Sequence, residues 1–361
     1  MRRIAAEILI ALTLAPALSA GATGIVNIVD FGAAPNKSSD SGPAIQAAFN
    51  ALDPVQGGTV LCPPGVYNVA TPIVVGTPAV RFVGTAGLSY NEDLPYSGCT
   101  LVARTDNMTL LQFSAPGGKL IHSGPVIEYV NFREATPTGH TAVLIDIRNF
   151  NRWTARNVAV NFAKTGIKVT GIDDASWGYV PQLFCKESVT CVDQSTIEGG
   201  FLVTGGGLEP LSVGVRVRGS QARVIGVKFD CKNAATGVYI TGHDALVLGS
   251  NFEQCGMGVA VRDDGTQKWN GDQNRIIGNH FIGSDVEGSK GISLGPGADD
   301  NQVMGNTYEY PSIRVEDLGT DNVRLEEGMA GDQDVACPAG QAVRGMRIRH
   351  GVVMAVTCAA P

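Results

Sequence analysis

Carboxylates occur in the sequence at positions that are typical of turns. Asp263 and Asp264 are adjacent, and Asp244 follows His243 directly. Glycosidic hydrolysis needs one carboxylic acid to protonate the leaving oxygen and a second carboxylate that acts as nucleophile or activates water. Histidine can exchange protons near neutral pH. We therefore treat these four residues as candidate catalytic groups. The alternative is that an aspartate in a tight turn only caps the local backbone. For Asp173 we expect this capping role.

Four cations and one tyrosine form a second candidate set: Lys168, Arg216, Arg218, Arg262 and Tyr239. Guanidinium groups match the carboxylates of uronic acids in bidentate fashion, and an aromatic ring offers a sugar a flat apolar face. A β-elimination also needs a cation to stabilise the developing enolate. We assign Arg216 and Arg218 as candidate catalytic residues and the other three as substrate-binding. The alternative is an ordinary charged sheet surface on which arginine stems cover apolar area.

A repeat positions these residues. Six segments alternate apolar residues and close on an aromatic, and they span 127–132, 158–162, 224–229, 247–252, 276–281 and 303–308. A second short strand follows each of the later aromatics, at 166–169, 214–217, 237–240, 258–261, 291–294 and 312–315. The aromatics recur every 23 to 30 residues where no long segment intervenes. One coil of a parallel β-helix needs about this many residues.

Stacked coils place equivalent residues in columns about 4.8 Å apart. The inward column of the second strands is Ile167, Val215, Val238, Val259, Ile292 and Ile313. The outward column is Lys168, Arg216, Tyr239, Ala260, Ser293 and Arg314. Two residues further along lie Thr170, Arg218, Thr241, Arg262, Gly295 and Glu316. The residues before the aromatics should mark a bend, since asparagine tolerates left-handed backbone; they are Asn131, Asn161, Lys228, Asn251, His280 and Thr307.

Residues 171–207 depart furthest from the repeat and are expected to form an insertion. They contain Trp177 and Tyr179, and Trp269 occurs in a second, shorter departure. Long loops on a rigid scaffold commonly carry recognition, so these three aromatics are candidate sugar platforms. The alternative is that they pack on the side of the solenoid.

Composition narrows the class of protein. The chain holds 46 glycines and only 6% aromatics, which favours many short strands joined by tight turns. Arg2 and Arg3 precede an apolar run that ends in small residues near Ala20, as in a secretory signal peptide. Removing residues 1–20 takes away two arginines and one glutamate, which changes the formal net charge from −7 to −8. We therefore expect a secreted or periplasmic protein with no membrane span in the mature chain and no affinity for nucleic acid.

An even number of cysteines behind a signal peptide predicts disulfides rather than a metal site. We expect consecutive pairing, although eight cysteines allow 105 connectivities. The cysteines are Cys62, Cys99, Cys185, Cys191, Cys231, Cys255, Cys337 and Cys358. The segments 341–348 and 352–357 predict a C-terminal hairpin, which a disulfide would pin and which would cover an open end of the solenoid.

The N-terminal stretch carries a family resemblance. It begins Val29-Asp-Phe-Gly-Ala-Ala-Pro and continues with Gly57-Gly-Thr-Val-Leu-Cys-Pro-Pro-Gly-Val-Tyr67. It resembles the opening of the pectate-lyase-like superfamily, which includes polygalacturonases, rhamnogalacturonan-active enzymes and phage tailspikes. The resemblance implies a short capping helix, here with Ser41 as N-cap and residues 44–52 as helix, and a substrate groove along one sheet. The polygalacturonase catalytic motifs are not reproduced, so that mechanism is not carried over.

The sequence thus predicts an all-β, right-handed parallel β-helix with a capping helix and a disulfide-pinned hairpin. Its expected divisions are a signal peptide (1–20), an N-terminal cap (21–56), the solenoid (57–328) and a C-terminal cap (329–361). The predicted function is a polysaccharide lyase or glycoside hydrolase acting on an acidic glycan. It would need no cofactor, except that Asp263 and Asp264 could hold calcium in a lyase. The alternative is a non-catalytic carbohydrate-binding or adhesion protein. The sequence leaves metal binding and oligomeric state open.

Overall fold

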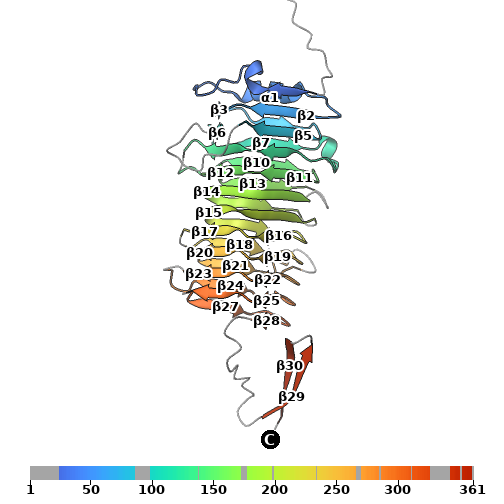
Figure 1. Cartoon of the computed structure of the whole chain (residues 1–361), viewed down its shortest axis with the longest axis vertical. Helices are drawn as coiled ribbons and strands as arrows, with labels where there is room; N and C mark the ends of the chain where they lie inside the picture. The colour runs from blue at the N-terminus through green and yellow to red at the C-terminus, as the bar shows by residue number, and fades with distance from the viewer. Residues whose placement is uncertain are drawn as a thin grey trace, which may run out of the picture.

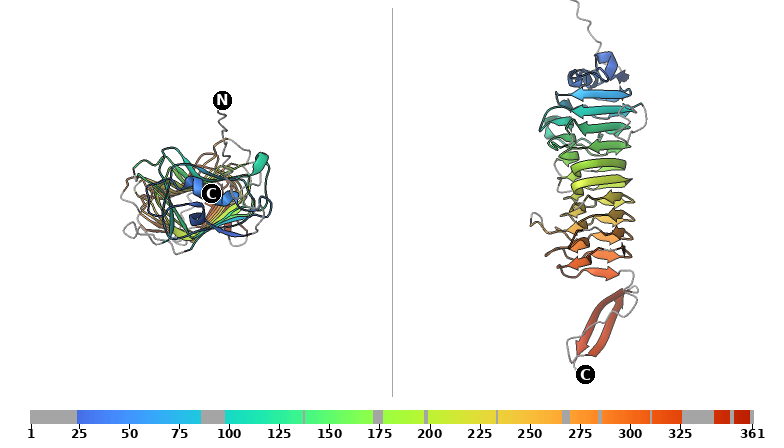
Figure 2. Two further views of the ribbon diagram at one scale, coloured as in Figure 1. Left: turned by 90° about the horizontal axis from the view of Figure 1, so that it is seen from above. Right: turned by 90° about the vertical axis from the view of Figure 1, so that its left-hand side faces the viewer.

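The computed structural model describes residues 24–85, 98–136, 138–171, 177–196, 199–232, 234–265, 270–283, 286–309, 311–325, 342–349 and 352–359. These residues form an all-β parallel solenoid of about ten coils with little helix (Figure 1). Viewed along its long axis, the coils stack around a common centre, and viewed from the side their strands form a ladder (Figure 2). The predicted fold class is confirmed.

Parallel pairing between coils arranges the strands in three sheets. The first sheet holds β1 (Ile25–Asn27), β2 (Gly58–Cys62), β5 (Val80–Gly84), β8 (Val126–Glu128), β11 (Trp153–Arg156), β16 (Arg223–Ile225), β19 (Leu246–Leu248), β22 (Arg275–Ile277), β25 (Gln302–Met304) and β28 (Val323–Leu325). The second holds β3 (Gly65–Val69), β6 (Cys99–Ala103), β9 (Val130–Glu134), β12 (Val158–Asn161), β17 (Lys228–Asp230), β20 (Asn251–Glu253), β23 (His280–Ile282) and β26 (Thr307–Glu309). The third holds β4 (Ile73–Val75), β7 (Thr109–Ser114), β10 (Val143–Arg148), β13 (Thr165–Thr170), β18 (Thr236–Ile240), β21 (Met257–Val261), β24 (Lys290–Leu294) and β27 (Ile313–Asp317).

Two long strands, β14 (Gly178–Gln194) and β15 (Phe201–Val217), run through all three sheets without a break. They pair with each other along most of their length. They also pair with β11, β12 and β13 on one side and with β16, β17 and β18 on the other. The described part of the expected insertion, 177–196 and 199–207, therefore belongs to two regular coils rather than to a loop.

The interior is a column of apolar side chains, as alternation predicts. Phe229, Phe252, Phe281 and Tyr308 stack with successive ring centroids 4.7, 4.8 and 5.2 Å apart. This confirms the later half of the aromatic repeat. The earlier half is out of register, because Phe132 stacks on Val160 and not on Phe162.

Buried amide side chains mark the bends of the later coils. The oxygen of each amide accepts a hydrogen bond from a backbone N–H of the preceding coil, at 2.8 to 2.9 Å. One ladder consists of Asn274, Asn301 and Asn322. The other consists of Asn279 and Asn306 and begins at the backbone amide of Ser250. The expected bend column was wrong by one position, since Lys228, Asn251, His280 and Thr307 are the first residues of strands. An inward-pointing amide can satisfy backbone groups that an outward side chain cannot reach.

Two corrections apply to the predicted columns of the third sheet. Val192 and Asp193 of β14 stack between Ile167–Lys168 and Val215–Arg216, so one coil was missing from the prediction. In the last coil, Ile292 pairs with Val315 and Ser293 with Glu316, so Ile313 and Arg314 are not the equivalents of Ile292 and Ser293. In this register Val315 is more buried than Ile313. The Glu316 carboxylate accepts hydrogen bonds from Lys290 and Ser293.

The N-terminal end is closed by a 3-10 turn, η1 (Ile28–Phe31), and by helix α1 (Gly42–Asn50). Ser41 occupies the N-cap position but makes no capping hydrogen bond with its side chain. Asp40 supplies the carboxylate instead and accepts from the Gly42 and Ala70 amides at 2.8 and 2.9 Å. A second 3-10 turn, η2 (Pro116–Gly118), precedes β8.

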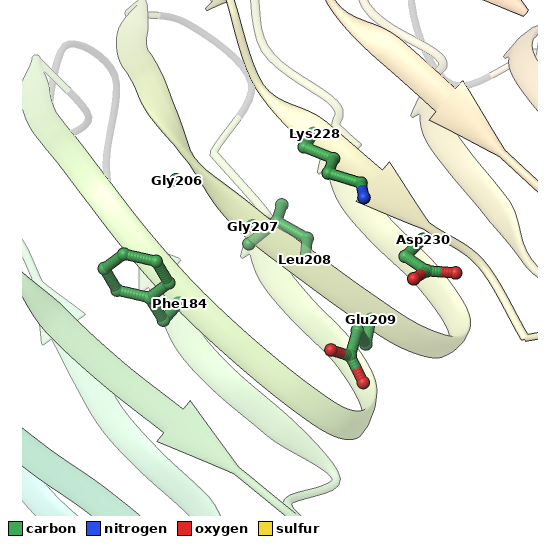
Figure 3. A pocket seen from close by; sticks show the side chains of 7 residues that line it. All are labelled: Phe184, Gly206, Gly207, Leu208, Glu209, Lys228 and Asp230. Carbon is green, nitrogen blue, oxygen red and sulfur yellow. The ribbon is translucent and has the colours of Figure 1, made fainter. Parts of the chain in front are cut away.

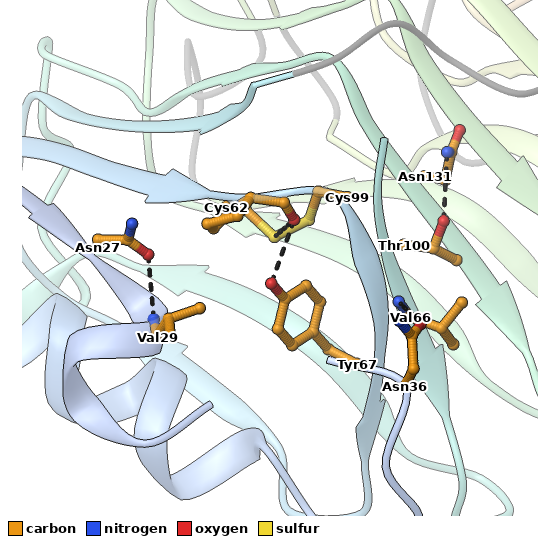
Figure 4. The surroundings of a disulfide bond; sticks show 10 residues. Asn27, Val29, Asn36, Cys62, Val66, Tyr67, Cys99, Thr100 and Asn131 are labelled. Carbon is orange, nitrogen blue, oxygen red and sulfur yellow. Dashed lines mark hydrogen bonds between the residues drawn. A yellow bond between two sulfur atoms is a disulfide. The ribbon is translucent and has the colours of Figure 1, made fainter. Parts of the chain in front are cut away.

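Three of the four expected disulfides lie within the described residues. Cys62–Cys99 links β2 to β6 of the next coil, beside the buried Tyr67, whose hydroxyl donates to the Pro63 carbonyl at 3.2 Å (Figure 4). Cys185–Cys191 closes a short loop within β14, and Cys231–Cys255 joins neighbouring coils. Consecutive pairing is confirmed for these six cysteines. A Cys337–Cys358 bond lies outside the described residues because Cys337 does.

The predicted C-terminal hairpin is present as β29 (Ala342–Arg349) and β30 (Val352–Ala359), which pair antiparallel in a sheet of their own. The signal peptide, Asp173, Asp174 and Trp269 lie outside the described residues.

Candidate functional site

Charged side chains line the outward face of the third sheet in its central coils. Asp146 of β10, Lys168 of β13, Asp193 of β14, Arg216 of β15 and Tyr239 of β18 occupy equivalent positions in five successive coils. We call these five residues the central row. Parallel strands lie about 4.8 Å apart, so a polymer lying along the solenoid would meet in turn the four groups that are partly exposed, from Lys168 to Tyr239.

The two carboxylates of the row differ in how well they are satisfied. Asp146 is 1% exposed, and its Oδ2 accepts from Nε and Nη2 of Arg148 at 2.7 and 2.5 Å. Asp193 has a side chain that is 14% exposed, with Oδ2 4.0 Å from Nη1 of Arg216. Its Oδ1 is buried and has no hydrogen-bond partner among the residues that the structure describes. Because an unmatched buried acceptor costs free energy, Asp193 is the polar group here whose presence folding alone does not explain.

Arg216 is held between Asp193 and Tyr239. Its guanidinium carbon lies 5.9 Å from the centroid of the Tyr239 ring, within the range of a cation–π contact. Its side chain remains 28% exposed, so the guanidinium can reach a ligand from this fixed position. Lys168 is half-buried and Arg218 exposed, and neither has an ion pair within the described chain. Lys168 nevertheless lies between Asp146 and Asp193 in the row, and Arg216 lies beside Asp193, so cations and carboxylates alternate along it.

In the C-terminal coils the positions equivalent to the central row are buried. Ala260 and Ser293 are fully buried there, and Arg262 turns its guanidinium onto the carbonyls of Val261 and Ser293, at 2.8 Å each. Glu316 accepts from Lys290 and from Ser293 at 2.6 Å. The hydrogen bond from Lys290, followed by that from Ser293, holds the pKa of Glu316 below its ordinary value. Arg262, expected to bind substrate, is therefore engaged with the backbone of the next coil.

Asp244 and His243 lie in the turn that leads from the third sheet to the first. Asp244 pairs with Nη2 of Arg275 at 2.9 Å and with Nη2 of Arg223 at 3.7 Å. These arginines begin β22 and β16, so Asp244 bridges three coils at the solenoid edge. His243 is half-buried in the same turn. Neither residue belongs to the central row.

Asp263 and Asp264 are exposed in the turn after β21. Asp263 accepts from the Gly265 amide at 2.7 Å, and Asp264 accepts from the Asn270 side chain. Asp272 nearby has a raised pKa, first because of its burial and then because of the charges of Asp299, Asp300 and Asp263. No group of three or more metal-ligating side chains gathers within the described part of the chain. The calcium hypothesis for Asp263 and Asp264 thus gains no geometric support.

Two shallow hollows lie where β14 and β15 cross from the first sheet into the second. One, of about 400 Å³, is lined by Arg156, Asn157, Tyr179, Pro181, Gln182, Thr204 and Gly205. The other, of about 370 Å³, is lined by Phe184, Gly206, Gly207, Leu208, Glu209, Lys228 and Asp230 (Figure 3). Tyr179 is 38% exposed and Trp177, just before β14, is 46% exposed, so neither packs into the core.

Sequence reasoning found Lys168, Arg216 and Tyr239 but missed Asp146 and Asp193. A signal was present, because the apolar stretches Val143-Leu-Ile-Asp-Ile147 and Thr190-Cys-Val-Asp-Gln194 each carry one carboxylate at an outward position. The coil of Asp193 was overlooked because its long strand has Cys185 and Cys191 at the positions where the other repeats have the inward aromatic and the glycine.

No helix in the described residues is long and apolar enough to span a membrane. No protein-family model and no curated protein sequence matches the chain. Among solved structures, DFA-IIIase from Arthrobacter chlorophenolicus A6 in complex with GF2 is similar, with 15% identity, a TM-score of 0.57, and coverage of 87% of this chain and 96% of that one. PfbA, a surface adhesin of Streptococcus pneumoniae, matches with 13% identity, a TM-score of 0.53, and coverage of 93% and 100%.

ORF18 of Geobacillus virus E2 matches with 15% identity and a TM-score of 0.56. The match covers 84% of this chain and spans only 61% of the length of ORF18. At such identities, the three similarities establish a shared β-helical fold and leave the choice between enzyme and adhesin to the chemistry of the central row.

Proposed function

We propose that the protein is an exported enzyme of the pectate-lyase-like superfamily that cleaves an acidic polysaccharide by β-elimination on the central row. The observation that carries the proposal is Arg216, a partly exposed guanidinium that lies between the Asp193 carboxylate and the Tyr239 ring. Both DFA-IIIase and PfbA share the fold, so the fold alone does not choose the function. Export is supported by the N-terminal signal-like segment and by three disulfides.

In this mechanism Arg216 binds the carboxylate of one uronate residue and stabilises the negative charge that develops on it. Tyr239 occupies the next coil, about 4.8 Å away. After its own hydroxyl proton has passed to solvent, the phenolate oxygen takes the proton from the carbon beside the carboxylate. The electron pair of that C–H bond forms a carbon–carbon double bond as the glycosidic carbon–oxygen bond breaks. The leaving oxygen takes a proton, from Tyr239 or water, and becomes the free hydroxyl of the other product.

The other members of the row bind and position. Lys168 lies two coils from Arg216, roughly 10 Å along the solenoid, where it meets the carboxylate of another uronate. Asp193 holds Arg216 from below through their 4.0 Å contact. Loss of Lys168 therefore raises KM, whereas loss of the Tyr239 hydroxyl lowers kcat.

Hydrolysis is the second candidate reaction. Asp146 and Asp193 are also two coils apart, and roughly 10 Å between their backbones is compatible with the about 6.5 to 9.5 Å between carboxyl groups in inverting glycosidases. Asp146 is buried and its Oδ2 accepts two hydrogen bonds from Arg148, so it does not face a glycosidic bond on the surface, which favours elimination.

The test is a product analysis on a panel of polyuronates and neutral polysaccharides, with and without added calcium. Ultraviolet absorbance of an unsaturated uronate supports the proposed reaction. Reducing ends without that absorbance would establish hydrolysis instead. Binding of an acidic glycan with neither product would show a carbohydrate-binding or adhesion protein.

A further inference from the structure

The outer face of the first sheet carries a column of aliphatic side chains in its last five coils. Its members pair one above the other from β16 to β28, and they are Ile225, Leu248, Ile277, Met304 and Leu325. Leu325 is 40% exposed and the other four are half-buried. The guanidinium groups of the neighbouring Arg223 and Arg275 turn aside to the Asp244 carboxylate, at 3.7 and 2.9 Å. A continuous apolar column on an outer face typically marks an interaction surface.

A row of glycines borders this aliphatic column on the side of the second sheet. Gly226, Gly249, Gly278 and Gly305 have φ between 58° and 62°, and a Cβ at each would meet no atom within 4 Å. The left-handed backbone does not by itself require glycine at this bend, because Asn157 occupies the same position in an earlier coil, at φ 47°. The glycines therefore leave open space in which another segment can approach the column closely.

We propose that the C-terminal hairpin of the same chain, β29 and β30, docks on this aliphatic column. The hairpin strands pair with each other in a sheet of their own, and a lone two-stranded hairpin is only marginally stable in water unless it packs on another element. β30 reads Val352-Val-Met-Ala-Val-Thr-Cys-Ala359 and contains no charged residue. The chain leaves the solenoid at Leu325, the last member of the column, and Figure 1 shows the hairpin just beyond β28.

The hairpin and the column match in size. Five coils extend about 24 Å along the solenoid, and three residues from the neighbouring column to the glycines extend roughly 10 Å across it. Each hairpin strand has 8 residues and is about 27 Å long, and the pair of strands is roughly 10 Å wide. Hairpin strands that run along the solenoid would cross the first-sheet strands at about 90°, which is one of the two usual ways in which sheets pack.

The hairpin of the same chain is a better occupant than a second copy. Residues 326–341 connect Leu325 to Ala342 and reach at most roughly 55 Å when extended, more than the length of the column. This tether gives the hairpin a high effective concentration at the column. A face of roughly 240 Å² is also far smaller than the about 800 Å² that each partner buries in a stable interface between separate chains.

The charges of the two parts are complementary. β29 contains three arginines, and neither hairpin strand contains an aspartate or a glutamate. The turns that lead into the first sheet carry carboxylates on the side of the column opposite to the glycines, and they are Asp272, Asp299, Asp300 and Asp321. Within the described residues none of these four forms an ion pair. The hairpin therefore fits with β29 on the acidic side and β30 over the aliphatic column.

The test is hydrogen–deuterium exchange of the full chain, followed by mass spectrometry of peptides from residues 342–359. Ile277→Lys places a cation in the middle of the aliphatic column and should make exchange in the hairpin about ten-fold faster. Gly278→Asn should act in the same direction, because asparagine is already accepted at this bend as Asn157 and its side chain would fill the open space. Unchanged exchange in β21 and β24 shows that the solenoid of each variant is folded.

Two control variants locate the docking surface. Ile282→Lys makes the same change in the same coil, at a half-buried position on the second sheet, and should leave exchange in the hairpin unchanged. Leu318→Lys changes a side chain of the last coil that is 58% exposed, and it should have no effect either. Faster hairpin exchange in Leu318→Lys but not in Ile277→Lys would place the hairpin over the open end of the solenoid and overturn the proposal.

A cross-link identifies the occupant. A photo-reactive p-benzoylphenylalanine in place of Gln302, exposed in β25 beside the aliphatic column, should couple to residues 342–359 within one chain. A cross-link to the hairpin of a second chain, or none to any hairpin, would contradict docking in the same chain. The variants leave the central row on the third sheet intact, so this outcome is independent of the proposed reaction.

Discussion

The central coils, from β13 to β18, and the C-terminal coils, from β19 to β27, have the same architecture. They differ in how fully their polar side chains are hydrogen-bonded or paired. In the C-terminal coils the amide ladders satisfy the bends, phenylalanines stack in register, and Glu316 is paired with Lys290 and Ser293. In the central coils, counting the described residues alone, one oxygen of Asp193 has no hydrogen-bond partner and Lys168 makes no ion pair.

The difference shows which part of the repeat serves stability and which serves binding. Regular columns let each coil satisfy the next one, which is what a solenoid needs in order to fold. The central coils depart from this regularity at the positions that face solvent, and their interior remains apolar. We therefore expect substitutions in the two regions to have opposite effects: C-terminal ones should lower stability, and central ones should lower activity.

The largest effect is expected for Tyr239→Phe. Removal of the hydroxyl takes away the proposed proton-transfer group, which is worth roughly 100-fold to 10,000-fold in kcat. The ring and its contact with Arg216 remain, so KM and the midpoint of thermal unfolding should stay close to those of the wild type. Turnover measured on the responsive polyuronate gives the result, and an unchanged kcat would remove Tyr239 from the mechanism.

Phe252→Ala should do the reverse. Phe252 is 1% exposed, between Phe229 and Phe281 at 4.7 and 4.8 Å, and its truncation leaves a cavity in the stack. We expect the free energy of unfolding to fall by about 3 to 5 kcal/mol, measured by denaturant titration. Activity per folded molecule should be retained. A loss of activity without a loss of stability would contradict the assignment of the C-terminal coils to stability.

Asn279→Ala tests the ladders. Its side chain accepts from the Ser250 amide at 2.9 Å and donates to the Val247 carbonyl at 3.0 Å, all within the buried bend. Each group left unmatched costs about 1 to 3 kcal/mol. Gln302→Ala, at an exposed position of β25, serves as the control. If both variants lowered the free energy of unfolding equally, the result would argue against the ladder.

The smallest effect concerns Glu316→Gln. The pKa of Glu316 is below its ordinary value of 4.5 because of the hydrogen bonds from Lys290 and Ser293. The folded state therefore favours the charged form, and this contribution to stability is present above the ordinary value and is lost as pH falls through the folded one. Wild type should be more stable than the variant by about 0.5 kcal/mol at neutral pH, and the two should converge once the pH has fallen below the pKa of Glu316 in the folded state. Denaturant midpoints across this range measure the difference, which should not grow as pH falls.

Much of the architecture could be predicted because a solenoid repeats its signals locally. Alternating apolar residues and recurring aromatics indicated the fold class, and the strands at Gly237, Gly258 and Gly291 were placed correctly, whereas the last one was out of register. The coil of β14 was missed because its strand is unbroken and carries no turn residue by which to recognise it. The bend column was misplaced by one residue, because sequence alone does not tell whether an asparagine points inward or outward.

The candidate site was predicted only in part, for a related reason. Outward position on the third sheet follows from period two, which identified Lys168, Arg216 and Tyr239. Whether a cation is free or already paired depends on the neighbouring coil, and this is why Arg262 was included and Asp193 was not. The turn carboxylates Asp244, Asp263 and Asp264 remain untested as catalytic groups, and the structure places them outside the central row.

The most direct test of the central row is lysine protection in the Tyr239→Phe variant, which should bind substrate without cleaving it. Acetylation of each lysine is followed by mass spectrometry with and without an oligouronate. We predict that the oligouronate protects Lys168. Lys228 at the start of β17, Lys232 just after β17, and Lys290 in the C-terminal coils should be unchanged. Protection of any of these three in place of Lys168 would contradict the assignment of the acidic-glycan site to the central coils of the third sheet.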